Sequence, residues 1–138
     1  TFEGMTEPGI NDYGLLNNKI LNKGDNYASE EMVFQKISQI NYDPKKIFLI
    51  KGDVRNTLKY SKHTKIAFLR QDTDFYDSTL ATLDYLYDSV IKNGIIVYDD
   101  YGHWQGQFDA VNHFHELRKS SPLLIRTSRK ERLEIKIN

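Results

Sequence analysis

IAFLRQDTDFYDST, residues 66–79, carries the strongest fold signal in this 138-residue chain. Its opening run of apolar residues is typical of a strand buried on both faces of a parallel sheet. Three aspartates follow within a few positions, namely Asp72, Asp74 and Asp77. One acid at this point would cap the next helix, but three at the mouth of a buried strand need a further explanation.

Strand and helix patterns alternate around this segment. Three apolar strands are expected, at Ile47–Ile50, Ile66–Leu69 and Ile95–Tyr98. The helix between the second and third strands should be capped by Asp77 or Ser78 and should end at Asn93-Gly94. This order predicts an α/β protein with a parallel sheet.

The flanking segments extend the same pattern. Residues 1–27 are rich in turn-forming residues, and a helix with an apolar stripe follows Ser29. A helix is also expected at Gln107–Lys119, with Leu117 on its buried face. Its two histidines are interpreted differently, His113 as structural and His115 as solvent-exposed. The tail predicts an antiparallel hairpin at the sheet edge, formed by Leu123–Thr127 and Leu133–Ile137.

Four acids follow consecutive predicted strands: Asp72, Asp74, Asp99 and Asp100. Ligands of parallel sheets bind beyond the carboxyl ends of the strands, so these carboxylates should converge. Neighbouring carboxylates repel one another unless a cation lies between them. Oxygen ligands favour Mg²⁺, Mn²⁺ or Ca²⁺. The alternative is that Asp72 and Asp77 cap the following helix and Asp99-Asp100 makes a polar turn.

His103 and Trp104 follow these acids directly. A histidine beside a metal site could accept a proton from a substrate hydroxyl, and the alternative is a surface loop residue. Trp104 would either form the wall of a substrate pocket or pack the loop.

Composition excludes several classes of protein and site. The 19 basic and 19 acidic residues cancel, which argues against nucleic acid or an anionic membrane as a partner. No apolar run approaches the roughly 20 residues of a membrane span. The absence of cysteine excludes disulfides and thiolate metal sites, and it fits a cytoplasmic protein.

Four motifs in order resemble the macrocin O-methyltransferase (TylF-type) family. They are TFEGMTEP (1–8), G-D-V-x-x-T-L (52–58), IAFLRQDTDFYDST (66–79) and GIIVYDDYGHWQG (94–106). The family pattern LRxDGDxYxST is matched at Arg70, Asp72, Asp74, Tyr76, Ser78 and Thr79, while Thr73 replaces the glycine. The family motif IDDYGxWxG is matched at Asp99, Asp100, Tyr101, Gly102, Trp104 and Gly106. Members of this family are class I S-adenosylmethionine-dependent methyltransferases that use Mg²⁺ and methylate a sugar hydroxyl.

The resemblance implies roles for individual residues. The implied metal ligands are Asp72, Asp99 and Asp100. Asp72 is also the implied proton acceptor, with His103 in reserve. The implied cofactor-binding residues are Thr1, Phe2, Asp53, Val54 and Asp72. The acceptor would be a small sugar or glycoside, and a homo-oligomer is possible.

The chain also departs from the family. The glycine-rich motif and the acidic residue that hold the cofactor should precede TFEGM, and neither is in the sequence. The tail SRKERLEIKIN replaces the expected aromatic, glycine-bearing ending. The expected fold is therefore α/β, a Rossmann-like class I methyltransferase sheet, mostly parallel with a C-terminal antiparallel hairpin and lacking the first N-terminal strands. Residues 1–138 would form a single, incomplete methyltransferase domain, the C-terminal portion of a longer enzyme.

Two other functions stay open at this point. Asp72-Thr73-Asp74 also fits the D-x-D motif with which glycosyltransferases present a metal to a nucleotide sugar. A chain without the glycine-rich motif could instead be a non-catalytic methyltransferase-like fragment. Binding of S-adenosylhomocysteine, of a nucleoside diphosphate, or of neither would separate the three.

Overall fold

The parallel strand pair predicted from the sequence is formed, and it occupies one edge of the described sheet. The computed structural model describes residues 2–60 and 65–137. Its four strands are β1 (Ile66–Gln71), β2 (Val90–Tyr98), β3 (Leu124–Arg126) and β4 (Arg132–Ile135), and they form one sheet in the order β1-β2-β4-β3. β1 pairs with β2 in parallel, β4 is antiparallel to β2, and β3 is antiparallel to β4. The α/β class and the antiparallel hairpin at the sheet edge are confirmed.

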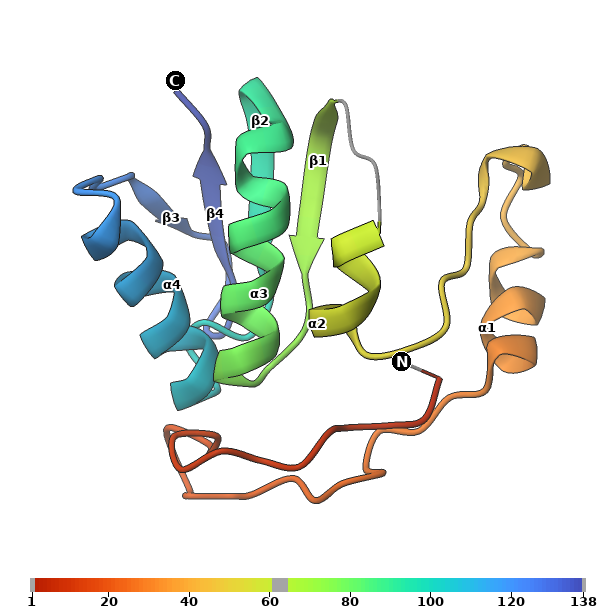
Figure 1. Ribbon diagram of the computed structural model, residues 1–138, viewed down its shortest axis with the longest axis horizontal. Helices are drawn as coiled ribbons and strands as arrows, with labels where there is room; N and C mark the ends of the chain where they lie inside the picture. Colours follow the sequence, from red (N-terminus) through yellow and green to blue (C-terminus); the bar gives the residue numbers. More distant parts are fainter. Residues whose placement is uncertain (1, 61–64, 138) are drawn as a thin grey trace.

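Two helices cover one face of this sheet (Figure 1). The helices are α1 (Glu30–Ile37), α2 (Val54–Thr57), α3 (Tyr76–Leu86) and α4 (Gln105–Leu117), with 3₁₀ turns at Pro44–Lys46, Leu58–Tyr60 and Tyr87–Ser89. α3 and α4 bury Leu83 and Val111 against Ile96 of β2, and none of these three side chains is exposed to solvent. Because β1 and β2 are parallel, α3 serves as the crossover that connects them.

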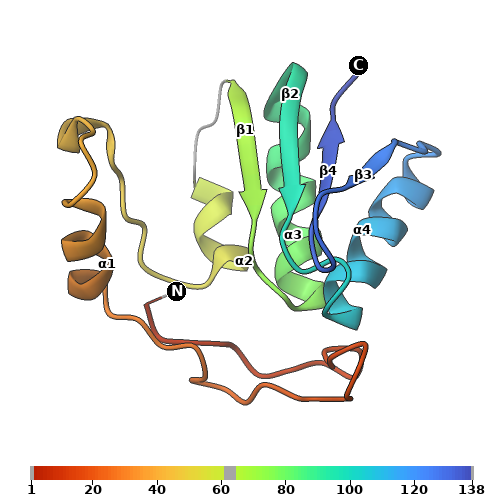
Figure 2. The same ribbon diagram turned by 180° about the vertical axis from the view of Figure 1, so that it is seen from behind.

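None of the described helices covers the opposite face of the sheet (Figure 2). Residues alternate between the two faces of a strand, so Phe68 points away from the helices that cover Leu69. Phe68, Ile135 and Ile125 are 59%, 45% and 40% exposed. Within the described ranges, the sheet is therefore packed on one side only. None of the described helices is both long and apolar enough to cross a membrane.

The strand expected at Ile47–Ile50 is not formed. These residues lie away from the sheet and pair with no described strand, and Phe48 is 80% exposed. A strand needs a neighbour for its backbone N–H and C=O groups, and apolar composition alone does not supply one. As a result, only one of the three pairings in the sheet is parallel, whereas a mostly parallel sheet was expected.

Several predicted boundaries also shift. α3 begins before Asp77 and Ser78, so neither residue is its cap. Asn93-Gly94 lies inside β2 and does not end the helix; Asn93 has φ 64°, and β2 is irregular there. Leu117 was expected to be buried but is 69% exposed at the end of α4.

A buried polar group holds the C-terminal hairpin against the helices. Glu134 of β4 is 1% exposed and accepts hydrogen bonds from the hydroxyls of Tyr98 (2.6 Å) and Tyr87 (2.7 Å). His115 Nε2 lies 3.3 Å from Glu134. His115 is only 5% exposed, so its interpretation as a solvent-exposed residue was wrong. Lys136, directly after β4, donates from Nζ to the carbonyls of Tyr87 (2.8 Å) and Val90 (2.9 Å), which ties the end of the hairpin to the turn between α3 and β2.

The hydrogen bonds to Glu134 also set its protonation state. Burial alone would raise the pKa of Glu134, but hydrogen bonds from His115, Tyr98 and Tyr87 outweigh burial and hold the pKa below its ordinary value of 4.5. A group whose pKa is lower in the folded state than in the unfolded state stabilises the fold. This contribution is fully present at pH values above the unfolded-state pKa. That contribution is lost as pH falls through the folded value.

Glu134→Gln should therefore lower the free energy of unfolding at pH 7 by about 1–3 kcal/mol, because it weakens a fully buried hydrogen-bond acceptor. The difference from wild type should shrink as pH falls below about 4.5. Urea unfolding at several pH values measures both effects. Glu116→Gln, at an exposed position of α4, is the control and should stay within about 0.5 kcal/mol of wild type. Equal stability of Glu134→Gln and Glu116→Gln at pH 7 would contradict the prediction.

Candidate active site at the carboxyl ends of the strands

Three of the predicted acids meet where β1 and β2 end. Gln71 of β1 is in register with Tyr98 of β2, so the residues that follow each strand emerge side by side. One carboxylate oxygen from each of Asp72, Asp99 and Asp100 lies within 4.8 Å of the others. The predicted convergence of these three acids is present in the structure. We call Asp72, Asp99 and Asp100 the acidic group.

Asp74 lies beside the acidic group and forms a side-chain hydrogen bond with Asp100. It is 8% exposed and has φ 55°, a left-handed conformation that is uncommon for a residue other than glycine. Burial, together with the charge of Asp100 and a hydrogen bond to it, raises the pKa of Asp74 to about 8. Burial and the charges of Asp99 and Asp100 also raise the pKa of Asp72, against the opposing effect of Arg70. Four carboxyl groups this close do not all ionise easily without a cation.

Arg70 supplies positive charge inside this cluster. Its guanidinium lies 3.1 Å from Asp72 Oδ2 and 2.7 Å from Asp99 Oδ1. Hydrogen bonding to Asp99 raises the pKa of Arg70 further, so it stays charged. This role was not predicted, although the spacing contained a signal: residues 70 and 72 lie two apart and so project to the same side of an extended strand.

A buried glutamine of α4 fixes the two strand ends. Gln107 is fully buried, and its Oε1 accepts a hydrogen bond from the backbone N–H of Asp100 at 2.8 Å. Its Nε2 donates to the carbonyl of Gln71 at 3.4 Å. The backbone N–H of Asp99 donates to the same carbonyl at 3.0 Å. Backbone bonds of this kind hold the acids in place without using their carboxylates.

The N-terminal arm, which we define as residues 2–28, runs along this edge of the sheet (Figure 1). It is fastened by an apolar contact in which Leu21 packs with Phe75 and Trp104, each of them less than 5% exposed. Trp104 therefore packs the loop, which was one of the two predicted roles. His103 is half-buried with its ring against Trp104, and burial together with Lys130 lowers the pKa of His103.

A cavity of about 360 Å³ opens between the arm and the end of β1. Phe2, Asp53, Val54 and Asp72, four of the five residues expected to bind cofactor, all line it. The fifth, Thr1, lies outside the described residues. The wall on the side of the sheet also includes Thr73, Asp74 and Ser78. The remaining lining residues are Val33 of α1 and, from the arm, Gly4, Met5, Thr6, Asn26 and Ala28.

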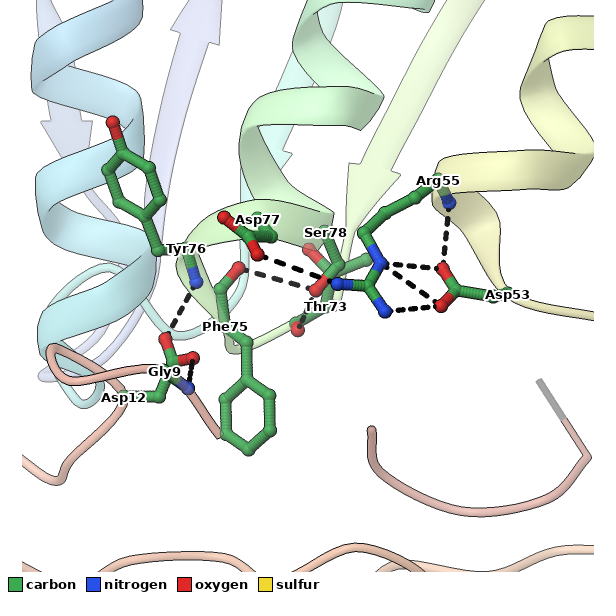
Figure 3. Close-up of polar contacts among 9 residues, drawn as sticks. All are labelled: Gly9, Asp12, Asp53, Arg55, Thr73, Phe75, Tyr76, Asp77 and Ser78. Atoms are coloured by element: carbon green, nitrogen blue, oxygen red, sulfur yellow. Dashed lines mark hydrogen bonds and ion pairs between the residues drawn. The ribbon is translucent and has the colours of Figure 1, made fainter. Parts of the chain in front are cut away.

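The carboxylate of Asp53 is engaged by its neighbour Arg55 (Figure 3). It caps α2 by accepting a hydrogen bond from the backbone N–H of Arg55 at 2.9 Å, and it pairs with the guanidinium at 2.6 Å. These hydrogen bonds outweigh burial and lower the pKa of Asp53. Arg55 also reaches Asp77 of α3 at 3.5 Å. The arginine thus joins two segments that border the cavity, and it leaves Asp53 ionised.

Comparison with known proteins connects this geometry to a family. Residues 1–127 match the macrocin O-methyltransferase (TylF) family. The chain belongs to this family. This match confirms the resemblance that the four sequence motifs predicted, and all four motifs lie within the matched residues.

Individual relatives agree with this assignment to the family. It is 28% identical over 116 residues to demethyldecarbamoylnovobiocin O-methyltransferase of Streptomyces niveus, an alignment that covers 83% of this chain and 44% of that protein. The structure of the O-methyltransferase NovP superposes with a TM-score of 0.82 at 25% identity, covering 99% of this chain and 57% of NovP. A TDP-rhamnose 3'-O-methyltransferase of calicheamicin biosynthesis superposes with a TM-score of 0.52 at 25% identity, covering 62% and 39%. The chain spans about half the length of these relatives.

The acidic group gives a direct test of the predicted metal site. Asp99→Asn and Asp100→Asn should each weaken Mg²⁺ binding by at least about tenfold, because each removes a charged oxygen donor. Isothermal titration calorimetry measures the affinity, and circular dichroism checks that the fold is retained. Asp84→Asn on the exposed face of α3 is the matched control and should bind Mg²⁺ like wild type. Unchanged Mg²⁺ affinity in both Asp99→Asn and Asp100→Asn would rule the acidic group out as the metal site.

Proposed function

We propose that the protein is an S-adenosylmethionine-dependent O-methyltransferase that acts on a hydroxyl group of a sugar or glycoside. One observation carries the proposal: Asp72 belongs both to the acidic group and to the wall of the 360 Å³ cavity. A methyl donor in the cavity and an acceptor hydroxyl at the acidic group would therefore meet at this residue. Membership in the TylF family supports the same reaction.

The donor atoms of the acidic group fit Mg²⁺. Asp72, Asp99 and Asp100 offer only carboxylate oxygens, which are hard ligands, and the sequence has no cysteine thiolate that would favour a softer metal. Burial and the negative charge of Asp100 raise the pKa of Asp74, and a divalent cation would offset the contribution of that charge. When bound, Mg²⁺ would supply Lewis acidity that makes the acceptor hydroxyl more acidic. Arg70 provides part of this positive charge in the structure, and its flexible side chain has to release Asp72 and Asp99 as the cation binds.

The cavity has the chemistry of a nucleoside site. Phe2, Met5 and Val54 offer apolar contact, and Asp53 and Asp72 offer acceptors for hydroxyl or ammonium groups. We propose that Phe2, Asp53, Val54 and Asp72 contact S-adenosylmethionine, with Thr1 as a further contact. Arg55 donates two hydrogen bonds to each carboxylate oxygen of Asp53, so a cofactor hydroxyl would bind Asp53 by sharing or displacing one of these contacts.

Asp72 is the proposed proton acceptor. Its carboxylate is half-exposed and so is accessible to an acceptor hydroxyl, and a hydroxyl made more acidic by the bound cation would lie beside it. His103 is the alternative base. Its lowered pKa keeps the imidazole neutral at pH 7, but its ring packs against Trp104. The geometry therefore favours Asp72.

The names of the relatives support a small glycosidic acceptor. One is named for a TDP-rhamnose substrate and another for a novobiocin intermediate. A sugar hydroxyl beside a carboxylate fits the polar surroundings of Asp72 and Asp99. The balanced charge of the chain argues against nucleic acid or an anionic membrane as the partner. Assembly into a homo-oligomer is part of the proposal.

Ligand titration tests the proposed function against its alternatives. The protein should bind S-adenosylhomocysteine in calorimetry and should not bind a nucleoside diphosphate in the presence of Mg²⁺. The reverse result would identify a glycosyltransferase that uses Asp72-Thr73-Asp74. Binding of neither ligand would identify a non-catalytic methyltransferase-like protein, a possibility consistent with a chain that spans half the length of its relatives.

Turnover of two variants separates the candidate bases. Asp72→Asn should lower kcat by about a hundredfold or more, because proton acceptance and metal binding fail together. His103→Ala should lower kcat by less than about tenfold, equivalent to roughly 1.4 kcal/mol of barrier. Both are measured at saturating Mg²⁺ so that weaker metal binding is not mistaken for slower chemistry. If His103→Ala were as inactive as Asp72→Asn while still binding metal and cofactor, the base would be the histidine.

A further inference from the structure

The start of α3 is capped by a residue from a distant part of the chain. The N-cap position, Phe75, has no side chain able to accept a hydrogen bond. Asp12 of the N-terminal arm supplies the acceptor: its Oδ1 accepts from the backbone N–H of Tyr76 at 2.7 Å, across 64 residues of sequence. Its Oδ2 accepts from the backbone N–H of Gly9 at 2.7 Å (Figure 3). A negative charge at this point also interacts favourably with the helix dipole.

A third segment of the chain, the start of α4, helps to bury Asp12. Asp12 is only 4% exposed, and a buried carboxylate needs hydrogen-bond partners of this kind. Gly106, in the first turn of α4, lies against it. A Cβ atom at residue 106 would come within 2.1 Å of Asp12 Oδ1 and within 2.7 Å of the nitrogen of Tyr76. The structure thus admits the carboxylate only because residue 106 has no side chain.

Asp12 connects the two walls of the cavity. On one side, the loop 72–75 leads directly into Tyr76, and this loop contains the left-handed Asp74. On the other side, the arm that carries Asp12 also carries Phe2, Gly4, Met5 and Thr6 of the cavity wall. The Asp12 carboxylate therefore links the start of α3, next to the wall formed by the loop 72–75, to the N-terminal arm, which contributes to the other wall.

We propose that Asp12 is a positioning residue for the cofactor cavity, which rests on the proposed function of that cavity as the S-adenosylmethionine site. It touches neither the cavity nor the acidic group. Its hydrogen bonds hold the arm at a fixed distance from the loop 72–75, so that residues 2–6 and Asp72 contact the same ligand. Loss of these bonds leaves the groups that carry out the chemistry unchanged and separates the surfaces that bind the cofactor.

The test compares Asp12→Ala and Asp12→Asn with Asp25→Ala in the full-length protein. Asp25 is the matched control because it lies in the same arm and also accepts a backbone hydrogen bond, from Asn22 at 2.9 Å, without reaching α3. Asp12→Ala removes both acceptors. Asp12→Asn keeps one acceptor oxygen and should give an intermediate result. Hydrogen exchange at the Tyr76 amide should accelerate in Asp12→Ala and should match wild type in Asp25→Ala.

The functional readout is a split between KM and kcat. Asp12→Ala should raise the KM for S-adenosylmethionine and the dissociation constant of S-adenosylhomocysteine by about tenfold, equivalent to about 1.4 kcal/mol. Its kcat at saturating cofactor and Mg²⁺ should stay within about threefold of wild type, since Asp72 and the acidic group are intact. A purely structural role would lower the amount of active protein, and hence apparent kcat, without changing KM.

The outcomes separate the two proposals. Wild-type affinity in Asp12→Ala, or an equal loss in Asp25→Ala, would overturn the positioning role while leaving the methyltransferase assignment in place. Failure of the wild-type protein to bind S-adenosylhomocysteine would overturn the proposed function and with it the role of Asp12 at that site. If Asp12→Ala does not fold, Asp12→Asn decides: a raised KM supports the proposal and an unchanged KM overturns it.

Discussion

The parallel pairing of β1 with β2 is the contact on which the candidate site depends. It sets Gln71 opposite Tyr98, and the next residues on each strand are the acids. A parallel pair requires a crossover, and α3 provides it while burying Leu83 against the sheet. The backbone conformation that places Asp72 and Asp74 is therefore fixed by a strand on one side and a helix on the other. A shift of one residue in this register would turn Asp72 to the opposite face of the sheet.

Burial of carboxylates close to one another is the main energetic cost of this arrangement. Asp72 and Asp74 both have raised pKa values, and Arg70 offsets only part of the repulsion from within the cluster. The C-terminal hairpin shows the opposite situation. There a single buried carboxylate, Glu134, receives enough hydrogen bonds to keep its pKa low. The contrast indicates that the fold satisfies buried charge where it is structural and leaves it partly unsatisfied where a cation is proposed to bind.

The arm and the sheet form one site although they are far apart in the sequence. Residues 2–6 contribute one wall of the cavity, residues 72–78 contribute the other, and Asp12 and the contact of Leu21 with Phe75 hold the two together. This arrangement explains how a chain about half the length of its relatives still presents a formed cavity at the carboxyl ends of its strands. Packing among the described residues is incomplete in two places. One is the uncovered face of the sheet, where Phe68 is exposed, and the other is the Ile47–Ile50 segment, which pairs with no described strand.

Local sequence patterns were enough to predict the α/β class, the β1–β2 pair, the C-terminal hairpin and the convergence of Asp72, Asp99 and Asp100. These features follow from short apolar runs and from acids placed directly after them. The family was predicted separately, from the resemblance of four motifs. Only the tertiary structure decided that Ile47–Ile50 stays unpaired, that His115 is buried against Glu134, and that Asp12 caps α3. Each of these depends on whether a distant part of the chain supplies a partner. Neither periodicity nor helix-capping rules specify which distant residue will lie next to a given segment.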